Sequence, residues 1–258
     1  MLQELEHDVR RALDTVVDPE LDESITDLGF VSSLAIDGDS VEVHLRLPTS
    51  FCAPNFAWLM ASDAQTAVAG VRGVRNVAVV LDDHTDSTLI NRGLAAGAGY
   101  RGTFGSEAED SLDYLRTTFQ RKAQIAAMER AITAWLHGDR SRTEADVADL
   151  TLGALPAGAP ETVTLLRRRA AVGMSLDDAA PVLLRADGTR PPPEQVPLEL
   201  RRARAVRISV DGNAHFCRGL LRTRYPGAEN DQAPRPDGEG TSRPPLPILS
   251  RTTESLEG

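Results

Sequence analysis

The stretch DPELDESITDLGFV, at residues 18–31, is the part of the chain that decides its fold. It follows residues 2–16, where leucine and valine recur at helical spacing and predict an amphipathic helix. The sequence DPE at 18–20 breaks that helix, and the acid-rich residues after it lead into an apolar run typical of a strand. The stretch therefore predicts a passage from a helix, through a polar loop, into a sheet.

The residues downstream predict a small α+β domain. The predicted elements are a hairpin of strands at 29–36 and 41–47, a helix from Pro54 to about residue 69, a third strand at 74–81 and a short helix at 86–96. We expect the third strand to pair with the hairpin and both larger helices to pack on one face of the sheet. The predicted order is helix, strand, strand, helix, strand, helix.

The chain of 258 residues divides by composition into three parts. They are the α+β domain at 1–98, a mainly helical extension at 105–226 and a tail at 227–258, whose Pro, Gly and acidic content predicts disorder. Within the extension, AVRISV at 205–210 is typical of a strand, and the residues after it predict a turn and a closing helix.

Composition argues against two classes of function. The formal net charge is −10, whereas a general nucleic-acid binder normally has a basic balance or patch. The arginines at 167–169 and those at 201, 202 and 204 are interpreted as solvated helix faces. The N-terminus lacks the apolar core of a signal peptide, and no stretch approaches the length of a membrane span. We therefore expect a cytoplasmic protein with no nucleic acid and no membrane among its partners.

The two cysteines, Cys52 and Cys217, are not expected to form a structural disulfide in that compartment. Cys52 lies two residues before Pro54, at the N-terminus of a predicted helix, where the helix dipole favours an anion. A thiolate is the form that binds iron or zinc and that attacks electrophiles. The alternative is that Cys52 is a small buried hydrophobic residue.

Two further groups could join a site at Cys52. Asp18 and Glu20 precede the hairpin that leads to Cys52, so their carboxylates could approach the thiolate; alternatively, Asp18 only caps a turn. His215 and Cys217 are spaced H-x-C, and in a strand or turn both could reach one metal ion together with Cys52. On a helix they would point in different directions and simply pack or face solvent.

A cysteine nucleophile is a third possibility. His84 and Asp83 follow the third strand and, with Cys52, would make a triad for a hydrolase or transferase. The chain shows no oxyanion-hole signature to accompany it. His44 alternates onto the polar face of its strand and is interpreted as solvated.

Taken together, DPELDESITDLGFV, the hairpin after it and T-x-x-C before a helix resemble the MIP18 family, the DUF59 domain of iron–sulfur cluster assembly proteins. The family pattern is D-P-E-[LI]-x-x-S-[IV]-x-[DE]-L-G-[LF]-[VI]. The matching residues are Asp18, Pro19, Glu20, Leu21, Ser24, Ile25, Asp27, Leu28, Gly29, Phe30 and Val31. Thr49 and Cys52 match the second motif of the family, and residues 71–81 resemble its closing strand.

This resemblance covers about residues 1–95 and implies a role in assembling or delivering iron–sulfur clusters or iron. It implies that Cys52 is the ligand, with Thr49, Asp18 and Glu20 beside it, and that the cofactor is iron or a transient cluster. Members of the family usually have glycine before this cysteine and proline directly after it, whereas this chain has Phe51 and Ala53.

The version FCAPNFAWLMASDA, with its long helical extension, is similar to members associated with bacterial diiron monooxygenase systems of the propane monooxygenase type. The resemblance thus implies a maturation factor, not an enzyme, whose partners are a client metalloprotein or other cluster-assembly proteins. One cysteine cannot hold a cluster stably, so transfer would need a homodimer, a small thiol or ligands of the client. The alternative is an adaptor that binds a client enzyme but no metal.

Overall fold

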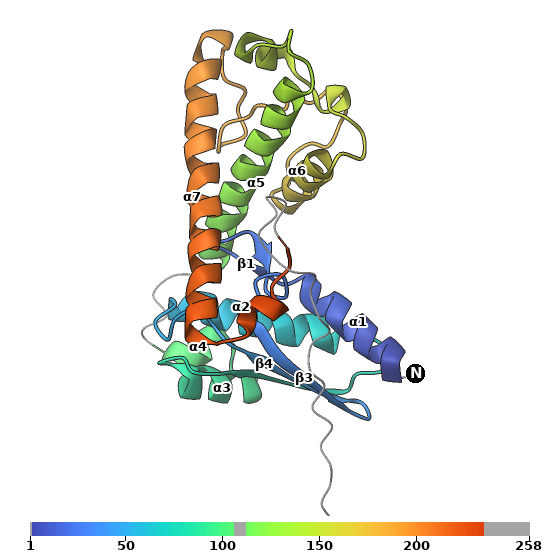
Figure 1. The fold of residues 1–258 in the computed structure, drawn as a ribbon, viewed down its shortest axis with the longest axis vertical. Coiled ribbons are helices and arrows are strands. Elements are labelled where there is room, and N and C mark those ends of the chain that lie inside the picture. Colours follow the sequence, from blue (N-terminus) through green and yellow to red (C-terminus); the bar gives the residue numbers. More distant parts are fainter. Residues whose placement is uncertain (1, 106–111, 235–258) are drawn as a thin grey trace, which may run out of the picture. The chain divides into compact units, whose positions relative to one another are not determined.

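The computed structural model describes residues 2–105 and 112–234, and their contacts form two compact units. The first unit contains residues up to 112 together with those from 214 onward, and the second contains residues 113–213. The predicted fold class is confirmed: an N-terminal α/β domain with a three-stranded mixed sheet precedes a mainly helical region. Figure 1 labels the elements.

The N-terminal part of the first unit keeps the predicted order of elements. They are α1 Leu2–Asp14, β1 Val17–Asp18, β2 Glu23–Ser24, β3 Val31–Asp37, β4 Ser40–Leu45, α2 Pro54–Ala69, β5 Asn76–Leu81, α3 Ser87–Ala95 and α4 Gly99–Phe104. Strands β1 and β2 form an additional small hairpin within the acid-rich stretch. The last of these helices, α4, follows the elements predicted for the domain and contains two glycines, Gly99 and Gly102.

The main sheet has the strand order β3-β4-β5. Strands β3 and β4 are antiparallel, and β5 pairs with β4 in parallel, with Val43 opposite Val79. A parallel pair needs a long crossover, and α2 supplies it between β4 and β5. Because β4 alternates buried and half-buried residues, one face of the sheet is apolar and the other is polar.

The apolar face of the sheet carries the core of the first unit. Side chains from three helices, α1, α2 and α3, share one cluster with those of the strands. Fully buried members include Leu13, Leu34, Val43, Ala64 and Ile90. The expected packing of both larger helices on one face agrees with this cluster.

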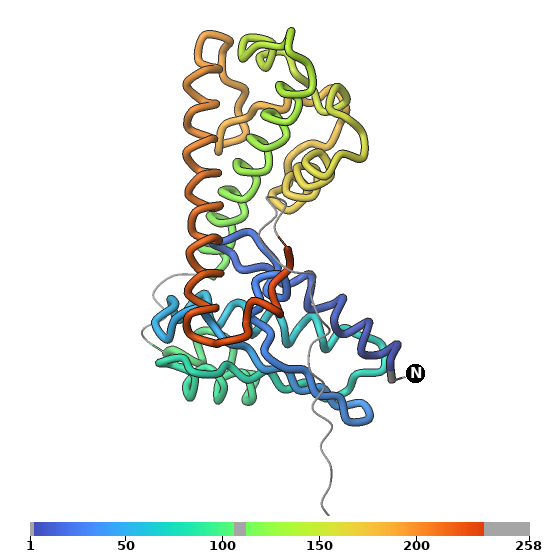
Figure 2. The backbone as a smooth tube through the Cα atoms, in the orientation of Figure 1, coloured from blue at the N-terminus to red at the C-terminus, as the bar shows by residue number. Residues whose placement is uncertain are grey.

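The C-terminal segment, residues 214–234, also belongs to the first unit. It consists of the last turns of α7 (Val196–Arg224) and the short helix η5 (Ala228–Asp231). Leu221 is fully buried in the same core as the sheet, and the N–H of Ala233 donates to the carbonyl of Asp27 at 2.9 Å. Figure 2 shows this segment turning back after the helix.

Polar contacts hold the C-terminal segment to the acid-rich stretch. The buried guanidinium of Arg218 pairs with Glu23, and Nη1 of Arg218 donates to the carbonyl of Ala233 at 3.2 Å. Gln232 is buried and donates to the carbonyl of Leu28 at 3.2 Å. Residues 228–232 are thus ordered within the tail predicted from residue 227, while 235–258 lie outside the described residues.

Gly29 shows how closely the two parts approach. Its φ of +77° is in the left-handed region, which side chains with a Cβ rarely adopt. A Cβ on Gly29 would also lie 2.9 Å from Cγ of Gln232. The glycine of the sequence DLGF therefore meets a local need of the backbone and a packing need of the C-terminal segment.

The second unit is helical and has its own core. Its elements are α5 Leu112–His137, η2 Glu144–Asp149, η3 Leu152–Ala154, α6 Pro160–Ala171, η4 Pro193–Gln195 and the first part of α7. Helices α5 and α7 lie side by side (Figure 1), and the buried carboxylate of Glu129 on α5 binds Arg204 and Arg207 on α7. Within the described residues, no helix is both long and apolar enough to cross a membrane.

The strand predicted at 205–210 is wrong, because these residues are part of α7. The two arginines that bind Glu129 are three positions apart, and this spacing places them on one helical face. Ala203 and Val210, seven positions apart, are buried. The short apolar run was misread because Arg204, which was interpreted as solvated, and Arg207 within the run are both partners of a buried carboxylate.

Candidate functional site

The loop before α2 presents Cys52 as expected. Helix α2 begins at Pro54, and Ala53 takes the N-cap position without a side-chain hydrogen bond. The hydroxyl of Thr49 accepts the N–H of Phe51 at 3.2 Å and lies 3.5 Å from Sγ of Cys52. Because one lone pair of that oxygen is taken by an N–H, the hydroxyl proton is free to point at the sulfur. Thr49 thus orients the half-buried thiol.

His84 fixes the same loop through its backbone. Its Nδ1 accepts the N–H of Asp86 at 3.0 Å, so the ring proton lies on Nε2, which donates to the carbonyl of Cys52 at 2.7 Å. Both ring nitrogens are therefore engaged with the backbone. Asp83 accepts from the hydroxyl of Tyr225 at 3.2 Å rather than orienting His84. The imidazole positions Cys52 and leaves no nitrogen to serve as a base for its thiol.

The C-terminal segment contacts this loop as well. Nη1 of Arg224 donates to the carbonyl of Leu47 at 3.1 Å, and Nη2 donates to the carbonyl of Asp83. The N–H of Thr85 donates to the carbonyl of Ser50 at 3.0 Å. The loop that carries Cys52 is consequently held on two sides, by the residues after β5 and by the end of α7.

Asp18 is the most deeply buried acidic residue of the acid-rich stretch. Its Oδ1 accepts the N–H groups of Glu20 and Leu21, both at 2.9 Å, so it caps the turn as one interpretation expected. Burial raises the pKa of Asp18 to about 6, even though those two hydrogen bonds lower it, and the charges of Glu20 and Glu23 add to the rise. A carboxyl group that titrates near neutral pH therefore lies in this stretch.

Cys217 lies near both of these features. It packs against the core cluster that Cys52 also contacts. Burial raises the pKa of the Cys217 thiol to about 12, and the charges of Asp18, Cys52 and Glu20 raise it further. The thiol of Cys217 is therefore close enough to Cys52, Asp18 and Glu20 for their charges to raise its pKa. Arg218, the next residue, pairs with Glu23 and so places Cys217 beside the acid-rich stretch.

His215 does not join this group. It is exposed on α7, and residues two positions apart on a helix point in different directions. Among residues 2–105 and 112–234, no three or more His, Cys, Asp or Glu side chains are arranged so that they could hold a metal ion by themselves. The structure thus brings Cys52, Cys217, Asp18 and Glu20 into one neighbourhood without a complete metal site.

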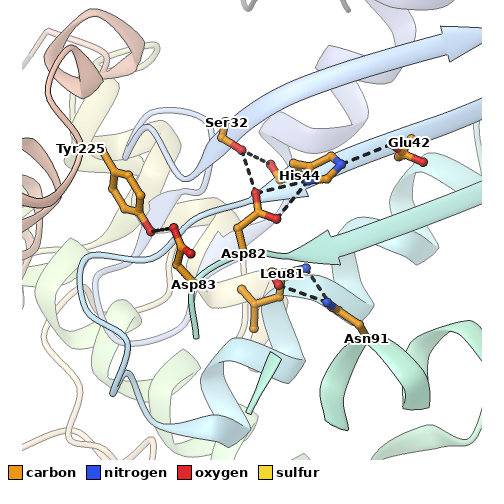
Figure 3. Close-up of polar contacts among 8 residues, drawn as sticks. All are labelled: Ser32, Glu42, His44, Leu81, Asp82, Asp83, Asn91 and Tyr225. Carbon is orange, nitrogen blue, oxygen red and sulfur yellow. Dashed lines mark hydrogen bonds and ion pairs between the residues drawn. The ribbon is translucent and has the colours of Figure 1, made fainter. Parts of the chain in front are cut away.

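A second polar cluster occupies the outer face of the sheet (Figure 3). Nδ1 of His44 lies 3.0 Å from a carboxylate oxygen of Asp82, and Nε2 lies 3.2 Å from one of Glu42. Partial burial lowers the pKa of His44, but the hydrogen bonds that its ring donates to the two carboxylates, together with their charges, outweigh this effect and raise the pKa. His44 is therefore partly buried and hydrogen-bonded to Asp82, which follows β5, and to Glu42, rather than fully solvated as expected.

Comparison with known proteins identifies the N-terminal part. Residues 6–79 match the model of the family described as iron–sulfur cluster assembly protein. An uncharacterised protein of Methanocaldococcus jannaschii is 34% identical over 88 residues, which make up 34% of this chain and 90% of that protein. Through this domain, the chain belongs to the iron–sulfur cluster assembly protein family. The family match ends before α3 and does not include the C-terminal segment.

The contribution of the C-terminal segment is what sequence reasoning described least well. The hypothesis that Cys217 shares a site with Cys52 rested on cysteine chemistry alone. The arginines that place it, Arg218 and Arg224, were not identified. Their only signal was a basic run, RGLLRTR, following a half-polar helix in a chain whose family motif is rich in acids.

Proposed function

We propose that this protein carries iron, or a transient iron–sulfur cluster, as cargo on Cys52 and delivers it to a client metalloprotein. One observation carries the proposal: the C-terminal segment holds a second thiol, Cys217, near the family cysteine and the acids Asp18 and Glu20. Membership of the iron–sulfur cluster assembly family supports the same reading.

The side chains around Cys52 suit transient rather than permanent binding of iron or a cluster. Thiolates favour iron and iron–sulfur clusters, and the negative charges of Asp18 and Glu20 attract a cation. Two thiols leave coordination positions on iron that other molecules must fill. A client, a small thiol or a second copy of this chain would supply the remaining ligands and could then take the cargo away.

The two thiols have different parts in this proposal. Cys217 keeps its proton at neutral pH because of burial and the acids around it, so it does not attract metal by itself. Cys52, at the start of α2, makes the first contact with the metal. The added positive charge then favours loss of the Cys217 proton, and the second thiolate closes on the same ion.

The role is that of a maturation factor rather than an enzyme. His84, the nearest candidate for a general base, uses both ring nitrogens on the backbone, so no Cys–His nucleophile pair is assembled at Cys52. We propose cytoplasmic action on a client metalloprotein, with a bacterial diiron monooxygenase as the specific candidate. Mixing the iron-loaded protein with the apo-hydroxylase tests this client, since loading should restore monooxygenase activity faster than free Fe²⁺ at equal concentration.

Anaerobic loading tests the proposed site directly. The full chain is titrated with Co²⁺ as a spectroscopic substitute for Fe²⁺, and then with Fe²⁺ and sulfide. We expect a sulfur-to-metal charge-transfer band that Cys52→Ser abolishes and Cys217→Ser weakens by about tenfold in apparent affinity. Phe216→Ser, an exposed neighbour on the same helix, is the matched control and should keep the band.

The possible results of this titration distinguish the carrier proposal from its alternatives. A wild-type chain that binds neither metal, or a band that survives Cys52→Ser, contradicts the carrier proposal. A band lost in Cys52→Ser but unchanged in Cys217→Ser retains the family cysteine and removes Cys217 from the site.

An adaptor that binds a client without metal is the second candidate. It is favoured by two large apolar side chains next to the thiols in sequence: Phe51 is 82% exposed and Phe216 is 71% exposed. Exposed aromatic residues are frequent anchors of protein interfaces. In this case client binding and maturation would survive Cys52→Ser and fail in Phe51→Ser, whereas a carrier shows the reverse for maturation.

A further inference from the structure

Arg169 on α6 is a buried charge without an acidic partner. The side chain is fully buried, although the sequence suggested a solvated helix face. Its guanidinium donates only to backbone carbonyls: Nη1 to Ser175 at 3.3 Å, and Nη2 to Pro181 at 2.6 Å and to Val182 at 2.8 Å. Among the described residues, no carboxylate lies within ion-pair distance of it. The carbonyl oxygens accept hydrogen bonds from the guanidinium but do not neutralise its positive charge.

The guanidinium is also incompletely bonded. Nε of Arg169 is buried and has no hydrogen-bond partner. Burial alone lowers the pKa of Arg169 to about 10, without any compensating negative charge. Buried charges in proteins are normally paired. A donor without a partner and a positive charge without a partner both indicate that a negative group is missing from this place.

A pocket lies against this residue within the second unit. Its volume is about 500 Å³, and Arg169 lines it together with two exposed arginines, Arg121 of α5 and Arg190. Arg190 is bonded to Asp149 at 2.8 Å, so its charge is already paired outside the pocket lining. Asp187 lines the pocket too, and hydrogen bonds from the hydroxyl and N–H of Thr189 lower its pKa, so one negative charge faces the three arginines. Positive charge therefore dominates the walls.

We propose that this pocket binds a small anionic molecule, a phosphate monoester or a carboxylate, whose negative group pairs with the exposed Arg121 and compensates the buried charge of Arg169. The apolar side chains Val172, Met174 and Leu184 line the same pocket, so the ligand has an apolar part beside its anionic group. Arginine matches the geometry of phosphate and carboxylate oxygens. The site gives the helical second unit a binding role that does not involve either cysteine.

Calorimetric titration of the full chain tests the proposal with three probes: phenyl phosphate, inorganic phosphate and benzoate. We expect phenyl phosphate to bind at one site with a Kd of about 1 mM or lower, and inorganic phosphate to bind more weakly. Arg121→Glu should weaken phenyl phosphate at least about tenfold, and Arg121→Lys, which keeps the charge, by no more than about threefold. Tighter binding of benzoate than of phenyl phosphate supports the site and assigns it to carboxylates.

The matched control is Arg167→Glu, which changes an exposed arginine of α6 that does not line the pocket. It should leave the affinity within about threefold of wild type. The absence of saturable binding of all three probes up to about 10 mM overturns the proposal, as does equal weakening by Arg167→Glu and Arg121→Glu. Cys52→Ser should leave anion binding unchanged, so the result is independent of the metal-loading experiments.

Discussion

The family-matched part, residues 6–79, and the C-terminal segment, residues 214–234, meet in one core by different means. The family-matched part folds according to signals that are local in the sequence. They are the break after α1, the turn between β3 and β4, and the proline at the start of α2. The C-terminal segment has no family match and is attached through contacts that span most of the chain, such as Arg218 with Glu23 and Ala233 with Asp27.

This difference shows which part of the site lies outside the family match. The family part supplies Cys52 and the acid-rich stretch, and their geometry follows from the motif. The C-terminal segment adds Cys217, Arg224 and Tyr225 around the same loop. A chain can therefore alter the surroundings of a family cysteine by changing residues far outside the family domain.

The largest expected effect compares the two parts through matched leucines. Leu34 on β3 and Leu221 in the C-terminal segment are both fully buried. Because each would leave a cavity, Leu34→Ala and Leu221→Ala should both lower the free energy of unfolding by about 2–5 kcal/mol, measured by urea denaturation. Leu220→Ala, at a partly exposed neighbour, should change it by under about 0.5 kcal/mol. A small effect of Leu221→Ala alone would show that the segment is not part of the core.

The ion pair between the two parts gives the next largest effect. Arg218→Met removes the partner of Glu23 and should lower the free energy of unfolding by about 2–4 kcal/mol, because a part-buried carboxylate is left unpaired. It should also make the C-terminal segment more susceptible to limited proteolysis. Arg201→Met, at an exposed position of the same helix, is the control. Equal behaviour of the two variants contradicts the attachment described here.

Asp18 offers a pH test of the acid-rich stretch. Its pKa is about 6 in the folded protein against an ordinary value of 3.8, so the folded state holds the proton more tightly than the unfolded chain. Stability is therefore lost as the pH rises from about 4 to about 7. Asp18→Asn keeps the oxygen that accepts from Glu20 and Leu21 but cannot ionise.

We expect Asp18→Asn to raise the free energy of unfolding by about 2–3 kcal/mol at pH 8 and to leave it unchanged at pH 4. Thermal unfolding across this range measures the difference. Asp37→Asn, at the exposed last residue of β3, should follow the wild-type curve. A variant less stable than wild type at pH 8 would mean that the Asp18 carboxylate has a partner that compensates its burial.

The smallest effect concerns the hydroxyl of Tyr225. Tyr225→Phe removes the hydrogen bond to Asp83 and should cost about 0.5–1 kcal/mol, as expected for a solvent-exposed bond. The more informative readout is the rate at which iodoacetamide modifies Cys52, which should rise if Tyr225 helps to hold its loop. Tyr114→Phe, at an exposed tyrosine of the second unit, is the control and should change neither quantity.

Much of the first unit could be predicted because its signals are local. Pro54 and Gly70 bracket α2 in the sequence as they do in the structure, and the DGD turn places the hairpin. The parallel pairing of β5 with β4 was not specified by any such signal. It follows from the crossover through α2, which fixes the direction of the returning strand.

The site was predicted less completely, and for a physical reason. Motif matching located Cys52, Thr49 and Asp18, since these lie within two continuous stretches. His84 and Arg224 act by donating to backbone carbonyls. Every residue has a backbone carbonyl, so the sequence does not indicate which carbonyls these side chains bind. The burial of Arg169 was missed for the same reason. Its partners are backbone carbonyls, and it belongs to a run of arginines that was interpreted as a solvated helix face.

Gly29 gives the family motif a second meaning in this chain. Its backbone conformation alone excludes most replacements, and Gln232 occupies the space where a Cβ would be. Two independent constraints, one from the backbone conformation and one from the packing of the C-terminal segment, therefore act on a single position. Removing the C-terminal segment would release the packing constraint and leave the backbone constraint in force, so a residue with a Cβ at position 29 would stay unfavourable in the family domain alone.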